Sequence, residues 1–272
     1  MTTPTILQKI VASKQKHVAH TKNKVSLETL QAQAKTHAPR GFARALRAVD
    51  TQASIGVISE IKKASPSKGV ICQNFDPVAT AIGYQKAGAT CLSVLTDVEY
   101  FCGADDYLKQ AKNVSTLPIL RKDFMIDEYQ IVESAALGAD CILLIMACLD
   151  DQTVARLHAR ALEYGLDVLI EIHTDDELER ALMLPASAHN IYGINNRNLN
   201  TFTVDLHNSI VLADRLRQKL GDDTLIVTES GIHCAADVNL MQRHHIHHFL
   251  IGEQFMKTND AGQALAKLLS DI

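Results

Sequence analysis

The chain has 272 residues, enough for two ordinary domains or for one large domain. Hydrophobic residues make up 47% of the sequence and charged residues 21%, so the chain can bury a large core beneath a polar surface. The formal net charge of −4 shows no basic excess, which argues against nucleic acid as the main partner.

The amino-terminal segment MTTPTILQKIVASKQKH lacks the long apolar core and the small-residue cleavage site of a signal peptide. Apolar runs such as CILLIMACL are far too short to span a bilayer. The six cysteines are scattered without a CxxC pair, so structural disulfides are not expected. We therefore expect a cytoplasmic protein with no membrane partner.

The first fifty residues are predicted to form helices. Ile6 and Ile10 fall at helical spacing, and Ser26 is a suitable N-cap for the helix that follows it. Phe42 and Leu46 predict another short apolar face. No low-complexity linker separates these helices from the rest of the chain.

From residue 56 onward, short apolar runs alternate with helical stretches. Each run is rich in β-branched residues and about as long as a strand. Several helical stretches end in a glycine that suits a helix C-cap, as Gly88, Gly138 and Gly165 do. The predicted strands are 56–62, 91–97, 117–124, 141–147, 167–173, 191–197, 225–231 and 248–253.

Eight strand–helix units at intervals of roughly 22 to 34 residues predict an α/β fold of the (β/α)₈ TIM-barrel class. No GxGxxG follows the first predicted strand, which disfavours a dinucleotide-binding doubly wound sheet. We expect residues 1–272 to form a single domain. Residues 1–50 are then a helical N-terminal extension that packs over one end of the barrel.

In a barrel of this type the active site forms at the carboxyl ends of the strands, and the period of two decides which side chains point inward. The first strand places Glu60 and Lys62 on the same face as Ile58. Such a pair can bind anions and transfer protons, although a solvent-exposed ion pair is the alternative. The SPSKG loop that follows offers the Ser65 hydroxyl to a ligand.

The third strand points Lys122 inward with Leu120 and Phe124. In an apolar mouth, desolvation disfavours the ammonium form, and the pKa of Lys122 is expected to fall toward the working range of a general acid. A Schiff-base nucleophile is the other use of such a lysine. A lysine that extends to the rim of the barrel is the structural alternative.

The fifth and sixth strands also end in polar residues. Glu171 shares a face with Leu169 and is a candidate base, because a buried carboxylate is costly without a partner. Asn195 can hydrogen-bond a substrate hydroxyl or a neighbouring carboxylate. Arg197, just beyond the sixth strand, suits a planar carboxylate.

The last two strands predict a phosphate site. Ser230 and Gly231 end the seventh strand, and Gly252 and Glu253 end the eighth. Glycines there let backbone N–H groups point at an anion, and phosphate binds at these strand ends in many barrels. The run HHIHH at 244–248 leads directly into the eighth strand without an acidic or cysteine ligand, so no metal site is expected.

The order and spacing of these segments resemble indole-3-glycerol phosphate synthase, a family of tryptophan biosynthesis. The matching segments are SEIKKASPSKG, SVLTDVEYFCG, LRKDF, IEIH, GINNRNL, ESGI and FLIGE. They span nearly the whole chain, and the combination of SPSKG with LRKDF is highly specific. The resemblance implies that 1-(o-carboxyphenylamino)-1-deoxyribulose 5-phosphate is closed to an indole with loss of carbon dioxide and water. It implies no cofactor and no metal.

The resemblance also implies roles for the charged residues. Lys122 resembles the general acid that protonates the ribulose carbonyl. Lys62 resembles the residue that contacts the acidic groups of the substrate, and it can supply the dehydration proton. Glu60 and Glu171 are two candidates for the base, and the sequence leaves the choice between them open.

Further residues are implied to hold the substrate. Asn195, Arg197 and Ser230 resemble the groups that bind it and orient the carboxylates. Ser65 and Phe124 resemble residues of the substrate pocket.

The resemblance places the phosphate at the last two strands. Gly231, Gly252 and Glu253 are implied to bind it, the last two through backbone N–H groups. Phe101 and Leu143 are expected to extend the apolar wall for the anthranilate ring.

Two rival interpretations are weaker. A phosphoribosylanthranilate isomerase needs a Cys/Asp pair near the first and sixth strands, where this chain has Glu60, Lys62 and Asn195. A non-catalytic phosphate-binding barrel would need neither Lys122 nor Glu171. We expect a small phosphorylated molecule as the partner, and a monomer or a weak homo-oligomer.

Overall fold

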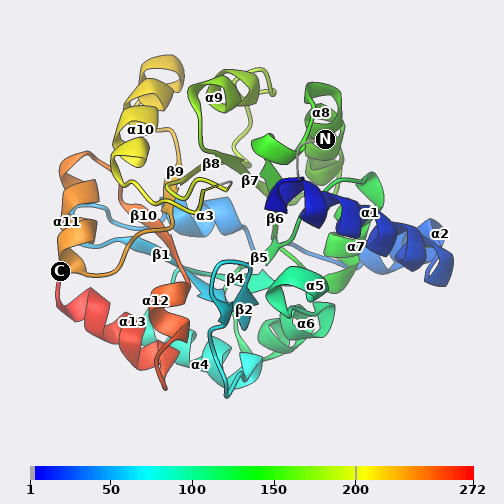
Figure 1. Ribbon diagram of the computed structural model, residues 1–272, viewed down its shortest axis with the longest axis horizontal. Helices are drawn as coiled ribbons and strands as arrows, with labels where there is room; N and C mark the ends of the chain where they lie inside the picture. Colours follow the sequence, from blue (N-terminus) through cyan, green and yellow to red (C-terminus); the bar gives the residue numbers. More distant parts are fainter. Residues whose placement is uncertain (1–3, 200) are drawn as a thin grey trace.

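The computed structural model describes residues 4–199 and 201–272. Its centre is a closed barrel of eight parallel strands in which β1 pairs with β4 on one side and with β10 on the other (Figure 1). The strands are β1 (Gly56–Ile61), β4 (Cys91–Leu95), β5 (Ile119–Lys122), β6 (Cys141–Ile145), β7 (Asp167–Ile172), β8 (Asn190–Asn195), β9 (Ile226–Glu229) and β10 (His248–Ile251). The predicted (β/α)₈ barrel is confirmed, and each observed strand overlaps its predicted run.

Helices surround the barrel (Figure 1). They are α4 (Pro77–Ala87), α6 (Asp105–Val114), α7 (Glu128–Leu137), α8 (Asp151–Glu163), α9 (Asp175–Ala181), α10 (His207–Leu220), α11 (Ala235–Arg243) and α13 (Ala261–Ser270). The loops after the strands add α5 (Val98–Phe101), a 3₁₀ turn η1 (Met146–Cys148), α12 (Glu253–Met256) and a hairpin of β2 (Ala64–Ser65) and β3 (Gly69–Val70). Gly88 and Gly138 end α4 and α7 with φ of 94° and 90°, as C-cap glycines do.

The strands are buried on both faces, which explains why they appear in the sequence as nearly continuous apolar runs. Ile58, Leu120 and Leu169 belong to the core inside the barrel, whereas Val57 and Val168 pack under the surrounding helices. The period-of-two assignment of the inward face is therefore correct for these strands.

The N-terminal extension consists of α1 (Ile6–Lys24), α2 (Leu27–Ala34) and α3 (Phe42–Arg47). Ser26 caps α2 as predicted, because its side chain accepts a hydrogen bond from the N–H of Thr29. Phe42 and Leu46 are fully buried and join the core inside the barrel. A hydrogen bond from Ala43 N to Asp167 Oδ2 at the start of β7 holds α3 at the amino-terminal end of the barrel.

The expectation that the extension covers one end of the barrel is wrong. While α3 closes the amino-terminal end, α1 lies at the opposite end, where Ile6, Leu7 and Ile10 line a cavity. The extension reaches both ends because α2, which packs beside α7, carries the chain along the side of the barrel.

The histidine-rich run lies at the amino-terminal end of the barrel. His248 opens β10, and its Nε2 donates to the Leu46 carbonyl oxygen at 3.0 Å. Gly56 leaves room for this ring, since a Cβ there would meet His248 at 2.5 Å. In the part of the chain that the structure describes, no three His, Cys, Asp or Glu side chains are grouped to hold a metal ion. Over the same residues, no helix has the length and apolarity needed to cross a membrane.

Candidate active site

A cavity opens at the carboxyl ends of the barrel strands and contains about 1200 Å³ of empty space, part of it open to solvent. All the residues predicted to act on the substrate or bind it line this cavity. They are Glu60, Lys62, Ser65, Lys122, Phe124, Glu171, Asn195, Arg197, Ser230, Gly231, Gly252 and Glu253. The chain therefore brings side chains from six of its strand ends and the loops after them into one space.

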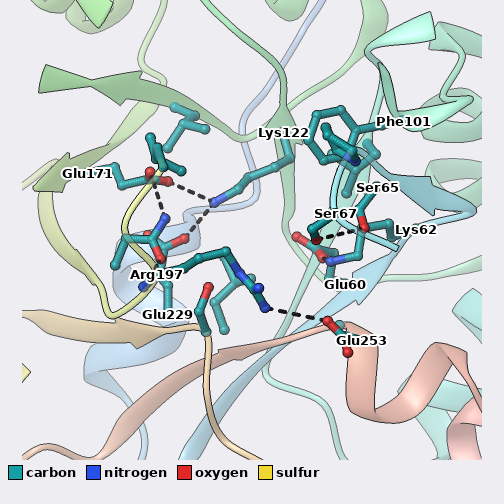
Figure 2. Close-up of a pocket in the computed structure, with 18 of the residues that line it drawn as sticks. Glu60, Lys62, Ser65, Ser67, Phe101, Lys122, Glu171, Arg197, Glu229 and Glu253 are labelled. Atoms are coloured by element: carbon teal, nitrogen blue, oxygen red, sulfur yellow. Dashed lines mark hydrogen bonds and ion pairs between the residues drawn. The ribbon is translucent and has the colours of Figure 1, made fainter. Parts of the chain in front are cut away.

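Lys122 is the centre of a buried charged cluster (Figure 2). Its Nζ lies 2.5 Å from Glu229 Oε2 and 3.2 Å from Glu171 Oε2. The other oxygen of Glu171 accepts a hydrogen bond from Asn195 Nδ2 at 3.0 Å. These side chains come from β5, β7, β8 and β9, so the cluster joins four strand ends of the barrel.

Glu229 belongs to this cluster, and the sequence interpretation did not give it a catalytic or binding role. It ends β9 two residues after Val227, which faces the barrel interior, so the same period of two would have pointed it inward. A second signal is Gly193 on the neighbouring strand. A Cβ at Gly193 would collide with the Glu229 carboxylate, so the glycine leaves the space that this side chain occupies.

The cluster shifts the proton affinities of its members. Burial raises the pKa of Glu229 to about 7, and the nearby Glu171 charge adds to the rise against the opposing effect of Lys122. Burial alone would lower the pKa of Lys122, but the carboxylates of Glu229, Glu171 and Glu60 outweigh it, so that this pKa is raised. The expected lowering of the Lys122 pKa is therefore wrong. The lysine lies between two carboxylates instead of in an apolar mouth, and its amine stays protonated, which disfavours Schiff-base chemistry.

A second ammonium–carboxylate pair lies on β1 and just after it. Lys62 Nζ forms an ion pair with Glu60 Oε1, and their side chains are only 15% and 5% exposed, which excludes a solvated surface pair. Gly252 at the end of β10 makes room for this pair, because a Cβ there would collide with the Glu60 carboxylate. The glycine predicted to bind phosphate thus also shapes the wall behind Glu60.

The mouth of the cavity carries a third group of charges (Figure 2). Arg197 Nη2 lies 3.4 Å from Glu253 Oε2, and Lys68 Nζ lies 3.9 Å from the other oxygen of Glu253. The Arg197 backbone N–H is held by Asn195 Oδ1 at 2.9 Å. The Glu253 side chain therefore lies between two cations, one from the β2–β3 hairpin and one from the loop after β8.

The turn after β9 has two consecutive residues in the left-handed region of backbone conformation. Ser230 and Gly231 both have positive φ, 67° and 84°. A Cβ on Gly231 would approach Val204 to 2.6 Å, so both conformation and space favour glycine there. Asn196 Nδ2 donates to the Ser230 carbonyl at 3.1 Å and holds the turn. Beside this turn, α12 begins at Glu253, where the N–H groups of a first helical turn have no intrahelical partners.

The apolar wall contains the three residues expected there. The rings of Phe101 and Phe124 lie 6.1 Å apart, and Leu143 lines the same cavity. The sequence interpretation missed the contribution of α1, whose Ile6 and Ile10 are also in the lining. No local pattern indicates that this helix lies across the mouth, since its position depends on contacts with distant loops.

Comparisons with known proteins identify the family and the fold. A family model described as indole-3-glycerol phosphate synthase matches residues 7–268. A crystal structure of 3-hexulose-6-phosphate synthase aligns with a TM-score of 0.60 and 14% identity, over 80% of this chain and 100% of that chain. Tryptophan synthase subunit alpha from Legionella pneumophila str. Paris aligns with a TM-score of 0.58 and 13% identity, over 86% and 97%. At these identities the solved structures show the shared fold alone, whereas the family model covers nearly the whole chain. The chain belongs to the indole-3-glycerol phosphate synthase family.

Proposed function

We propose that this cavity closes 1-(o-carboxyphenylamino)-1-deoxyribulose 5-phosphate to indole-3-glycerol phosphate, the decarboxylating lyase reaction of the family in tryptophan biosynthesis. A carbon of the aromatic ring bonds to the ribulose carbonyl carbon, and carbon dioxide and water leave. One observation supports the assignment of this reaction to the cavity. A buried ammonium group, that of Lys122, points into it between the carboxylates of Glu171 and Glu229.

Lys122 is the general acid of ring closure. Attack by the ring carbon turns the carbonyl oxygen into an alkoxide, which needs a proton and a nearby positive charge. The raised pKa keeps Lys122 in its ammonium form at neutral pH. An alkoxide is a stronger base than an amine, so the proton transfer remains favourable.

Loss of carbon dioxide restores the aromatic ring and leaves a hydroxyl group on the new five-membered ring. Dehydration then needs an acid for the departing hydroxyl and a base for a proton on the neighbouring carbon. Lys62 is the acid of this step, since it carries the other ammonium group of the buried wall. Its partner Glu60 holds it toward the cavity.

Glu171 is the base of the dehydration. Once Lys122 has given up its proton, the carboxylates beside it lose their counter-charge and become more basic. Asn195 fixes one oxygen of Glu171, and the other faces the Lys122 amine at 3.2 Å. The proton taken from carbon can thus return to Lys122. Lys62 regains its proton from solvent, which supplies the one proton consumed overall when a carboxylate leaves as carbon dioxide. Glu229, with its pKa of about 7, shares this proton at neutral pH.

The substrate lies between two ends of the cavity. Its phosphate binds to backbone N–H groups of Gly231, Gly252 and Glu253, at the turn after β9 and the start of α12. Its aromatic ring packs against the wall of Phe101 and Phe124.

The remaining polar residues orient the substrate. Ser65, Arg197 and Ser230 line the cavity, where their side chains can hydrogen-bond the carboxylate and hydroxyl groups of the substrate. With its carboxylate, phosphate and aromatic ring all held, the ring carbon is kept close to the carbonyl carbon.

The test is a fluorescence assay of the purified protein with this substrate and no added metal. We expect indole fluorescence to rise, and Lys122→Met to lower kcat by at least about a thousandfold while substrate still binds. Lys109→Met, which removes a lysine that is 53% exposed on α6, is the matched control and should leave kcat unchanged. A wild-type protein that binds phosphate ligands without turnover would indicate a non-catalytic barrel instead.

The same proposal covers the protein as a whole. Residues 1–272 work as one unit, in the cytoplasm, as a monomer or a weak homo-oligomer that needs neither cofactor nor metal. Sedimentation of the purified protein over a range of concentrations measures the oligomeric state. Turnover that persists after treatment with a chelator would show that no metal is needed.

A further inference from the structure

Helix α1 carries a lysine that is buried away from the catalytic residues. Lys14 is 3% exposed, and its Nζ lies 2.8 Å from Asp97 Oδ2 and 2.7 Å from Asp123 Oδ1. Both carboxylates are also 3% exposed. Asp97 follows β4 and Asp123 follows β5, so one ammonium group joins the extension to two loops at the mouth of the barrel.

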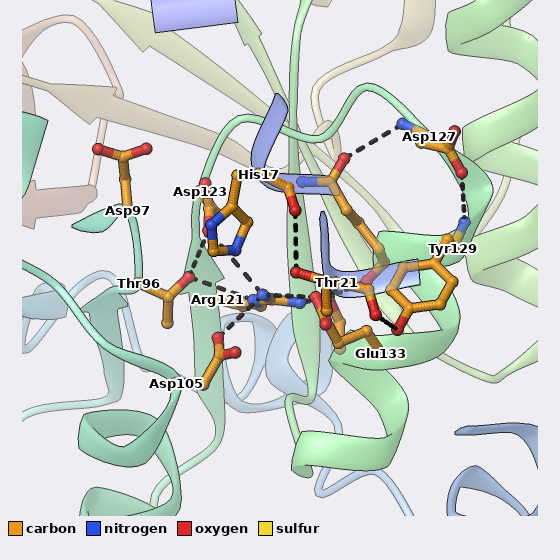
Figure 3. A network of polar contacts seen from close by, with 12 residues as sticks. His17, Thr21, Thr96, Asp97, Asp105, Arg121, Asp123, Asp127, Tyr129 and Glu133 are labelled. Carbon is orange, nitrogen blue, oxygen red and sulfur yellow. Dashed lines mark hydrogen bonds and ion pairs between the residues drawn. The ribbon is translucent and has the colours of Figure 1, made fainter. Parts of the chain in front are cut away.

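The Asp123 carboxylate connects this lysine to the end of β5. Its Oδ1 also accepts the Phe124 N–H at 2.7 Å, and its Oδ2 accepts the Thr96 hydroxyl at 2.7 Å. The Thr96 oxygen in turn accepts from Arg121 Nε at 3.1 Å (Figure 3). Arg121 and Asp123 are the two neighbours of the catalytic Lys122 in the chain.

The same face of α1 carries the residues that reach the cavity. Ile6, Ile10 and Lys14 are spaced by four residues, which places them in one row along a helix. Ile6 and Leu7, about two turns before the buried lysine, line the cavity together with Ile10, one turn before it. The ion pairs of Lys14 therefore lie on the same face of α1 as the residues that line the cavity.

We propose that Lys14 is a positioning residue for the reaction, a role that rests on the proposed function of the cavity. Its ammonium group holds α1 against the loops after β4 and β5, and through Asp123 it holds the backbone of Phe124. Lys14 itself does not touch the substrate. It keeps the wall formed by α1 and Phe124 closed around the aromatic end of the substrate.

Charge makes this contact hard to replace. Two cations, Lys14 and Arg121, face four carboxylates in the connected network, those of Asp97, Asp105, Asp123 and Glu133. Without the Lys14 charge, Asp97 and Asp123 repel each other in a dry site, and water must enter to solvate them. We expect this change to move α1 outward and to weaken substrate binding.

The decisive experiment measures KM and kcat separately for Lys14→Met. We expect KM to rise by at least about tenfold and kcat to fall by less than about threefold, because the proton-transfer groups remain in place. Lys14→Arg keeps the charge and should recover most of the KM. The matched control is Lys22→Met on the same helix, which removes an ion pair to Asp127. The Lys22 side chain is 44% exposed and that of Asp127 35%. Its KM should equal that of the wild type.

A variant with balanced charge distinguishes a loss of positioning from a failure to fold. Lys14→Met combined with Asp97→Asn removes one charge of each sign, and it too should raise KM while the thermal midpoint stays close to that of the wild type. In the wild-type protein, deuterium exchange at residues 6–18 should slow when an unreactive substrate, with its ketone reduced to an alcohol, is bound. That protection should be lost in the double variant.

The outcomes separate two failures. An unchanged KM in Lys14→Met and in the double variant overturns the role of Lys14 alone. So does a fall in kcat as large as the rise in KM. A wild-type protein that forms no indole product overturns the proposed function instead.

Discussion

The Lys122 ammonium group lies 2.5 Å from the Glu229 carboxylate, and the two side chains reach each other across the barrel from strands β5 and β9, which are not neighbours in the sheet. Oε1 of Glu229 is buried and has no hydrogen-bond partner in the described part of the chain. An unpaired buried oxygen is costly, which is one reason why the proton affinity of this carboxyl group is high. In the resting protein the pair therefore combines a lysine in its ammonium form with a carboxyl group that exchanges protons near neutral pH.

We expect Glu229→Gln to lower kcat by about a hundredfold or more, because the amide can neither take up the proton nor hold the Lys122 ammonium by charge. The pH dependence of kcat/KM, which reports groups of the free enzyme, should contain a titration near pH 7 in the wild type that is absent in the variant. Steady-state rates between pH 5 and 9 measure both effects. A variant that keeps the wild-type rate and pH profile would remove Glu229 from the proton transfers.

The same carboxyl group should affect stability in a defined pH window. Its folded-state pKa of about 7 exceeds the ordinary value of 4.5, so the folded state binds more protons than the unfolded state between these values. The contribution of Glu229 to the free energy of unfolding should therefore fall as the pH rises from 4.5 to 7. Relative to Glu229→Gln, the fall should reach up to about 3 kcal/mol. Urea unfolding of both proteins across this range is the measurement, and a constant difference between them contradicts the prediction.

The addition of a single methyl group at Gly193 or Gly252 should reduce activity. An alanine at Gly193 would collide with the Glu229 carboxylate, and an alanine at Gly252 with the Glu60 carboxylate. We expect either change to displace the catalytic side chain and to reduce kcat/KM by about tenfold or more. Gly83→Ala on α4 is the control, because its nearest neighbour would be 3.5 Å away, and its activity should stay unchanged. Equal activity in all three variants would show that the two carboxylates have room to move.

Strand periodicity predicted most of the barrel and the side chains that point into its cavity, because each barrel strand buries alternate residues inside. Glu60, Lys122 and Glu171 were found in this way without any knowledge of pairing. The pKa of Lys122 could not be predicted, since its direction depends on Glu229, which is 107 residues away along the chain. The burial of Lys14 could not be predicted from the sequence either, because a lysine on an amphipathic helix is normally exposed.

Helix α3, which closes the amino-terminal end of the barrel, should contribute to stability without affecting the chemistry. Leu46 is fully buried inside the barrel, so Leu46→Ala should lower the free energy of unfolding by about 3 kcal/mol. Val211→Ala, at a residue 42% exposed on α10, should change it by less than about 0.5 kcal/mol. Because α3 lies at the end of the barrel opposite the cavity, kcat/KM at low temperature should match the wild type. A selective loss of activity in Leu46→Ala would mean that α3 affects the cavity at the opposite end of the barrel.

Glu253 should weaken anion binding at the mouth of the cavity. Its carboxylate lies 3.4 Å from Arg197 and 3.9 Å from Lys68, next to the start of α12 where the phosphate is proposed to bind. Glu253→Gln removes a negative charge from this place and leaves both cations free for the substrate. We expect inorganic phosphate to inhibit the variant about two- to fivefold more strongly than the wild type, with a smaller difference at high salt. The inhibition constant at two ionic strengths is the measurement. Weaker inhibition of the variant would mean that the carboxylate chiefly holds Arg197 and Lys68 in their binding positions.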